Sequence, residues 1–225
     1  MSLLDLARGP ALWFALAVLV AGTIWRVLAI WRLGAPPDLS EPRGMRPLAG
    51  ALRGVLVHML PRKGVSLGTS LAYLNGYVYH LGLALIVLGY LPHIHFMERL
   101  MGFAWPALPE PAVFVAVGLT FVSLFIALLE RLTDPVRRLL STFDDYFSWF
   151  VVFLPLATGM IAIHQSYPAG TTPALPLDPL PLTVHLLSAE LLLVWLPFGK
   201  LAHAFLVFFS RGVTGAAMAR KGAAI

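Results

Sequence analysis

The chain has 225 residues, of which 59% are apolar and only 12% are charged, with a net charge of +5. This composition excludes an ordinary soluble domain and predicts one membrane domain over residues 1–225. The positive charge does not indicate nucleic acid as a partner, because the basic residues gather in a few loops between apolar segments. The chain has no cysteine, which excludes thiolate-bound iron–sulfur clusters and covalently attached c-type haem.

Five apolar segments are long enough to cross a bilayer, since ~20 residues at ~1.5 Å each cover its hydrocarbon core. They are, approximately, residues 10–31, 67–91, 112–129, 146–163 and 180–209. A weaker amphipathic stretch over about residues 48–60 carries Arg53 and His58, which predicts a helix at the membrane interface. The expected fold is therefore all-α, a polytopic membrane bundle of five transmembrane helices.

Lys and Arg gather on alternate sides of these spans. The segment between the first two spans contains six of them, and the loop between spans three and four and the C-terminal tail contain three each. The N-terminus and the loop between spans two and three contain one each, and the loop before the last span contains none. The positive-inside rule therefore places the N-terminus outside and the C-terminus in the cytoplasm.

The last span contains two histidines, His185 and His203, which are 18 residues apart. On one continuous helix this spacing is about five turns, so both imidazoles would lie on one face, roughly 27 Å apart along the axis. Placing an ionisable side chain inside a membrane span costs free energy, so such a residue is first interpreted as functional. Two of them near opposite membrane faces indicate two stacked metal or haem centres.

The second span supplies matching histidines. His80 is expected in its inner half, at the depth of His203, and His93 and His95 are expected at its outer end, at the depth of His185. Neutral imidazole is a standard axial ligand of haem iron, so each pair predicts one non-covalent haem b. The alternative is that these histidines only pack between helices.

The outer ligand from the second span has more than one candidate. On an ideal helix, His95 is rotated about 60° from His80 and His93 about 140°, which favours His95. Pro92 precedes His93 and can kink or end the helix, so the rotation does not decide between them. His164, at the outer end of the fourth span, is a third candidate.

The motifs YHLGLAL around His80 and PFGKLAHAF around His203 carry a family resemblance. The chain resembles the gamma-subunit family of respiratory nitrate reductase, whose members are di-haem cytochromes b. That family includes the membrane subunits of sulfite-reductase-associated and heterodisulfide-reductase-like complexes. The resemblance covers nearly the whole chain, and it implies five spans, an outer N-terminus and one bis-histidine haem near each membrane face.

The same resemblance implies the ligand set His80, His203, His185 and His93. The nitrate reductase pattern has its second ligand ten residues after His80, where this chain has Tyr90. The stretch PHIHFMERLMGFAWPALP is more similar to the sulfur-metabolism relatives, in which a histidine directly after the proline takes this role. His93 is therefore placed ahead of His95, and the departure argues against nitrate reductase itself.

Three other charged side chains lie in the spans. Arg26 is deeper in the first span than a snorkelling side chain requires, which indicates a partner such as a haem propionate. Lys200 precedes His203 by three residues and is expected to snorkel to the inner surface. Glu190 either relays protons or serves as a protonated packing residue.

The expected function is electron transfer between the membrane quinone pool and a cytoplasmic iron–sulfur subunit. Quinone is expected near His93, His95, Glu98 and Glu190, and the protein is expected in the cytoplasmic membrane of a bacterium or archaeon. The chain would then be the electron-transfer subunit of an oxidoreductase, with two haems b and no catalytic centre of its own. Two alternatives stay open: a haem-free membrane anchor, and a proton-coupled transporter that uses the histidines and Glu190.

Overall fold

The structure is a computed structural model that describes residues 1–34, 39–44, 46–57, 59, 64, 66–166 and 179–223, without the side chains of residues 164–166. The described residues form helices and no strands, which confirms the all-α prediction. Five helices are long and apolar enough to cross a membrane: Leu3–Leu33, Leu67–Gly89, Glu110–Thr133, Phe143–Ile163 and Lys200–Arg220. The chain divides into two compact units, Met1–Val65 with Gln165–Ile225, and Ser66–His164.

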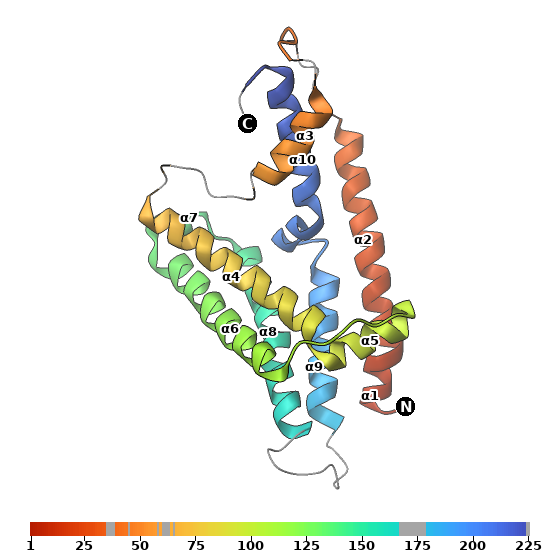
Figure 1. The fold of residues 1–225 in the computed structure, drawn as a ribbon. Helices are drawn as coiled ribbons and strands as arrows, with labels where there is room; N and C mark the ends of the chain where they lie inside the picture. Colours follow the sequence, from red (N-terminus) through yellow and green to blue (C-terminus); the bar gives the residue numbers. More distant parts are fainter. Residues whose placement is uncertain are drawn as a thin grey trace. The chain divides into compact units, whose positions relative to one another are not determined.

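The first unit combines the two ends of the chain (Figure 1). Its elements are α1 (Leu3–Leu6), the π-helical turn η1 (Ala7–Ala11), α2 (Leu12–Leu33), α3 (Pro47–Val57), α9 (Pro179–Trp195), the 3₁₀ turn η2 (Lys200–Ala202) and α10 (His203–Arg220). Ser2 and Asp5 form a reciprocal capping box at the start of α1. Gly34 ends α2 with a φ of 65°, which few other residues adopt. Within this unit α2 packs on α9, and α3 packs on α10.

The last apolar segment is broken near its middle. Helix α9 ends at Trp195, and α10 begins only at His203. Pro197 has no N–H with which to continue the helix, and Gly199 adopts an extended conformation before the 3₁₀ turn. The prediction of one continuous helix over residues 180–209 is therefore wrong, and with it the placement of His185 and His203 five regular turns apart on one face.

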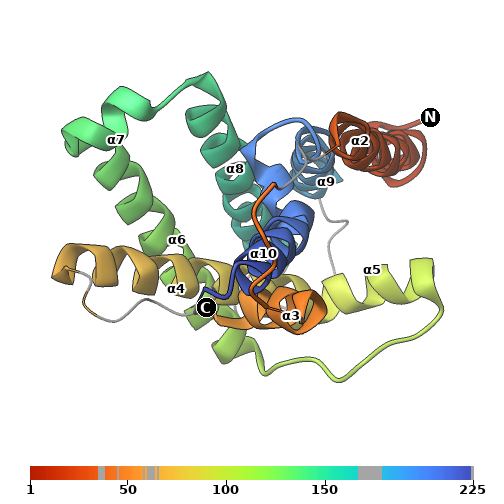
Figure 2. The same ribbon diagram turned by 90° about the horizontal axis from the view of Figure 1, so that it is seen from above.

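Helices α3 and α10 approach each other closely through glycines. A Cβ atom added to Gly54 would lie 2.7 Å from Gly215 Cα and 2.8 Å from Arg211 O, and one added to Gly50 would lie 2.6 Å from Gly215 O. Figure 2 shows α3 beside α10. The two helices run antiparallel, since Gly50 faces the end of α10 and Gly54 faces a position nearer its start. The stretch predicted as an interfacial helix is thus one half of a helix pair.

The second unit contains α4 (Leu67–Gly89), α5 (Leu91–Met101), α6 (Glu110–Thr133), α7 (Pro135–Leu140) and α8 (Phe143–Ser166). Gly82 of α4 lies against Thr120 of α6. Asn75 Nδ2 donates to the Ser123 carbonyl at 3.0 Å, and Ser123 Oγ donates back to Asn75 Oδ1 at 2.7 Å. Interhelical hydrogen bonds of this kind hold spans together where lipid offers no polar partner.

Aromatic and charged contacts join α6 to α8. Trp149 Nε1 donates to the Leu124 carbonyl at 2.9 Å, and the ring of Phe125 on α6 lies edge-on to Trp149, with centroids 5.9 Å apart, and to Phe153, with centroids 5.5 Å apart. At the end of these helices Arg131 Nη1 lies 2.7 Å from Asp145 Oδ1, whose side chain is only 4% exposed. A buried carboxylate requires such a partner, so this ion pair fixes how α8 begins beside α6.

Candidate functional site

His80 lies near the middle of α4, two residues beyond the central Val78. Its place in the inner half of the span stays a prediction. Its Nδ1 lies 2.6 Å from the Gly76 carbonyl, one turn earlier on the same helix. A carbonyl oxygen only accepts, so Nδ1 carries the proton and the lone pair is on Nε2.

His203 is the first residue of α10, directly after the 3₁₀ turn. Its Nδ1 lies 2.8 Å from the Lys200 carbonyl, so this imidazole has the same tautomer as that of His80. Hydrogen bonding of Nδ1 to a carbonyl is the usual outer-shell arrangement of a histidine that binds metal through Nε2. The same two hydrogen bonds would also form if the histidines only packed between helices and donated to backbone carbonyls.

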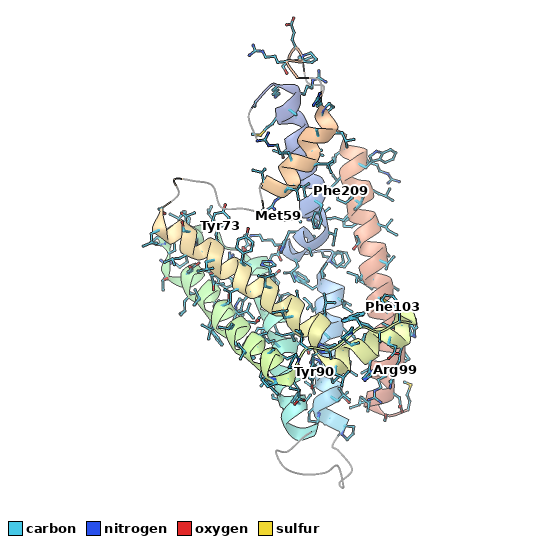
Figure 3. The ribbon with its side chains drawn as sticks, in the orientation of Figure 1. Met59, Tyr73, Tyr90, Arg99, Phe103 and Phe209 are labelled. Atoms are coloured by element: carbon cyan, nitrogen blue, oxygen red, sulfur yellow. The ribbon has the colours of Figure 1, made fainter. Side chains whose placement is uncertain are left out.

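His93 lies beyond the kink between α4 and α5. Tyr90 interrupts the helix with a φ of −81° and a ψ of 126°, and Pro92 opens α5 (Figure 3, where Tyr90 is labelled). The His93 Nδ1 reaches back to the Ile86 carbonyl at 3.0 Å, the third imidazole with this tautomer. Its side chain is half-buried, and desolvation lowers the pKa of His93 below its ordinary value, which favours the neutral, ligating form.

His95 has a different environment. Its side chain is 57% exposed, and its Nδ1 lies 3.2 Å from Glu98 Oε2 on the next turn of α5. The rotation that favoured His95 assumed one ideal helix from His80 onward, and α4 ends at Gly89. That rotation argument is therefore wrong, while the choice between His93 and His95 stays a prediction.

His185 lies in α9 and is half-buried. Ser188 Oγ donates to its carbonyl at 2.7 Å. On the same helix Glu190 is 7% exposed, and the described residues offer it no hydrogen bond or ion pair. The side chains of the other candidate, His164, and of His58 lie outside the described residues.

The five candidate histidines are divided between the two units. His80, His93 and His95 belong to the second unit, and His185 and His203 belong to the first. The pairing of His80 with His203 and of His185 with His93 stays a prediction from the sequence. Among the described residues there is no group of three His, Asp or Glu side chains that could hold a metal ion. A bis-histidine haem iron takes two protein ligands.

Two polar contacts in the structure were not predicted from the sequence. Arg26 Nη1 donates to the Phe198 carbonyl at 3.3 Å, so the partner of this guanidinium is the backbone at the break between α9 and α10. Asn75, which bonds to Ser123, is a polar residue inside the second span, and its type and position were a signal for a helix contact.

The comparisons with known proteins give one relative. No family model and no solved structure matches the chain. A protein of Nitratidesulfovibrio vulgaris strain Hildenborough is 30% identical over 213 residues, which cover 92% of this chain and 89% of the relative. Identity of this extent along nearly the whole of both chains shows that the chain belongs to the same family as the N. vulgaris protein.

Proposed function

We propose that the chain is a di-haem b-type cytochrome that transfers electrons between membrane quinone and the iron–sulfur subunit of a respiratory oxidoreductase complex. One observation carries this proposal: His80, His203 and His93 each hold Nδ1 against a backbone carbonyl. That bond sets the tautomer in which Nε2 has the ligating lone pair, and it keeps the ring from rotating.

His80 and His203 would hold one haem, and His185 with His93 would hold the other. Without cysteine the attachment is non-covalent, and the imidazoles carry the binding. When bound, haem b supplies one-electron transfer. The protein's part is to keep the imidazoles neutral and oriented, which the carbonyl bonds on His80 and His203 and the partial burial of His93 support.

The quinone would bind at the end of the second span, where α5 turns away from α4. Beside His93, the pair His95–Glu98 offers a hydrogen-bond donor and a proton acceptor there. Glu190, buried on α9, would accept a proton released on quinol oxidation. With the N-terminus outside, as the loop charges predict, these groups would lie near the outer face and the protons would leave outward.

The iron–sulfur subunit would dock on the helix pair α3–α10. Residues 39–57 and 203–223 contain a single acidic residue, Glu41. They contain six basic residues, namely Arg43, Arg46, Arg53, Arg211, Arg220 and Lys221. This excess of positive charge would steer an acidic protein surface towards the cytoplasmic side.

The first test is a reduced-minus-oxidised visible spectrum of the detergent-purified protein, with the haem extracted and counted per chain. We expect two low-spin haems b. The variants His80→Gly and His203→Gly should each lose one haem, and added imidazole should restore the low-spin spectrum because it replaces the missing ligand. Full haem content in both variants, or no haem after haem-sufficient expression, would reject the proposal.

One observation favours a second candidate, a proton-coupled transporter. Helices interrupted within the membrane form the binding sites of many transporters, and the α9–α10 segment is interrupted in this way. A transporter would produce substrate flux in liposomes without a redox partner, and it would lack a Soret band. A protein with neither flux nor haem would be a membrane anchor.

A further inference from the structure

The break between α9 and α10 releases backbone groups inside an apolar segment. Leu196 N bonds to the Leu192 carbonyl at 3.0 Å and Gly199 N to the Trp195 carbonyl at 3.2 Å, whereas Phe198 N bonds only three residues back, to Trp195 O. In a continuous helix Ala202 N would bond to the Phe198 carbonyl, whereas here it bonds to Gly199 O at 3.1 Å. The Phe198 carbonyl therefore needs a partner from elsewhere, because lipid offers an unpaired carbonyl no hydrogen-bond donor.

One face of α2 meets this break with three residues at helical spacing. Gly22 lies against Pro197, so that an added Cβ would be 2.8 Å from Pro197 Cγ. The Trp25 ring lies 6.4 Å from that of Phe198, and Arg26 Nη1 donates to the Phe198 carbonyl at 3.3 Å. Pro197 is less than 2% exposed.

The break also decides where His203 points. Only the 3₁₀ turn Lys200–Ala202 separates the broken residues from this histidine, and the His203 ring bonds to the first carbonyl of that turn. The direction of the 3₁₀ turn is set by the backbone of residues 196–199, against which α2 packs. A shift at Phe198 would therefore be transmitted to the imidazole through about one turn of backbone.

We infer that the Gly22–Arg26 face of α2 holds the break in place and thereby orients the imidazole of His203. Arg26 is a positioning residue: it acts on His203 through the Phe198 carbonyl and the 3₁₀ turn. The inference rests on the proposed function, since it concerns His203 as a haem ligand. It differs from the earlier expectation that Arg26 meets a haem propionate.

The test compares Arg26→Gln, Arg26→Lys and Gly22→Ala with the control Arg32→Gln, which removes an exposed charge from the same helix. Electron paramagnetic resonance of the oxidised, purified protein reports the g values of each low-spin haem, which depend on the orientation of the axial imidazoles. We expect Arg26→Gln and Gly22→Ala to change the g values of one haem. Arg26→Lys, which keeps a donor, should restore most of the wild-type signal, and Arg32→Gln should leave both signals unchanged.

A haem-independent measurement accompanies the spectra. Amide hydrogen exchange over residues 198–203 of the full chain should be faster in Arg26→Gln than in wild type. Wild-type g values and wild-type exchange rates in Arg26→Gln would overturn the inference. If that variant does not accumulate in membranes, wild-type g values in Gly22→Ala would overturn it instead. His203→Gly separates the two proposals: if it loses one haem while the α2 variants match wild type, the cytochrome stands and the positioning role falls. If His203→Gly keeps both haems, both proposals fail.

Discussion

The imidazoles of His93 and His95 lie two residues apart and have opposite surroundings. The His93 ring is half-buried and bonds back across the kink to the Ile86 carbonyl. The His95 ring is 57% exposed, and its Nδ1 lies 3.2 Å from Glu98 Oε2 on the next turn of the same helix. A haem ligand must stay neutral and fixed, which the environment of His93 provides.

Substitution separates these two residues. His93→Ala should remove one of the two haems, because it deletes an axial ligand, and His95→Ala should keep both. The measurement is the haem-to-protein ratio with the low-spin spectrum of each purified variant. Haem loss in His95→Ala with full retention in His93→Ala would exchange their roles. Retention in both would move the outer ligand to another residue such as His164.

At the scale of elements, the α3–α10 pair depends on the absence of side chains. A Cβ atom added to Gly215 would lie against the Gly50 carbonyl and 2.9 Å from Gly54 Cα. Gly212, one turn earlier on α10, is different: its added Cβ meets only Val55 Cγ2, at 3.9 Å, which is ordinary van der Waals contact. The two glycines therefore form a matched pair for a test of close packing.

Gly215→Leu should separate α3 from α10, at a cost of about 1–3 kcal/mol for overpacking, whereas Gly212→Ala should be tolerated. Because the chain has no native cysteine, the contact between α3 and α10 can be measured with an engineered disulfide between Val55→Cys and Gly212→Cys. The disulfide should form on mild oxidation in the parent chain and be strongly reduced when Gly215→Leu is added. Equal cross-linking in both backgrounds would show that the glycines are not required for the pair.

At the scale of the whole molecule, the loop charges predict the orientation. By the predicted spans, the sides expected to be cytoplasmic contain 12 Lys and Arg, against two on the sides expected to be outside. Single cysteines at Leu3 and Ala223, near the two ends of the chain, should therefore react differently with a membrane-impermeant maleimide. Leu3→Cys should be labelled in right-side-out vesicles and Ala223→Cys only in inverted ones. Labelling of both from the same side would require an even number of spans.

The helical class and the first four spans are readable from the sequence because each depends on a long local run of apolar residues. The predicted segments 10–31, 67–91, 112–129 and 146–163 each fall mainly within one helix of the structure. The end of the second span and the interruption of the last one are harder to predict, since a proline in a span can be followed by a kink, a break or a continued helix.

The all-helical class, four of the membrane-spanning segments and the histidines within and beside them can be predicted from the residues alone. The end of α9 at Trp195, the contact of Arg26 with the Phe198 carbonyl and the pairing of α3 with α10 are visible only in the folded chain. Hydropathy is a sum over neighbours in the chain, whereas the last two features depend on partners more than 150 residues away, which must satisfy a carbonyl or fit against a glycine.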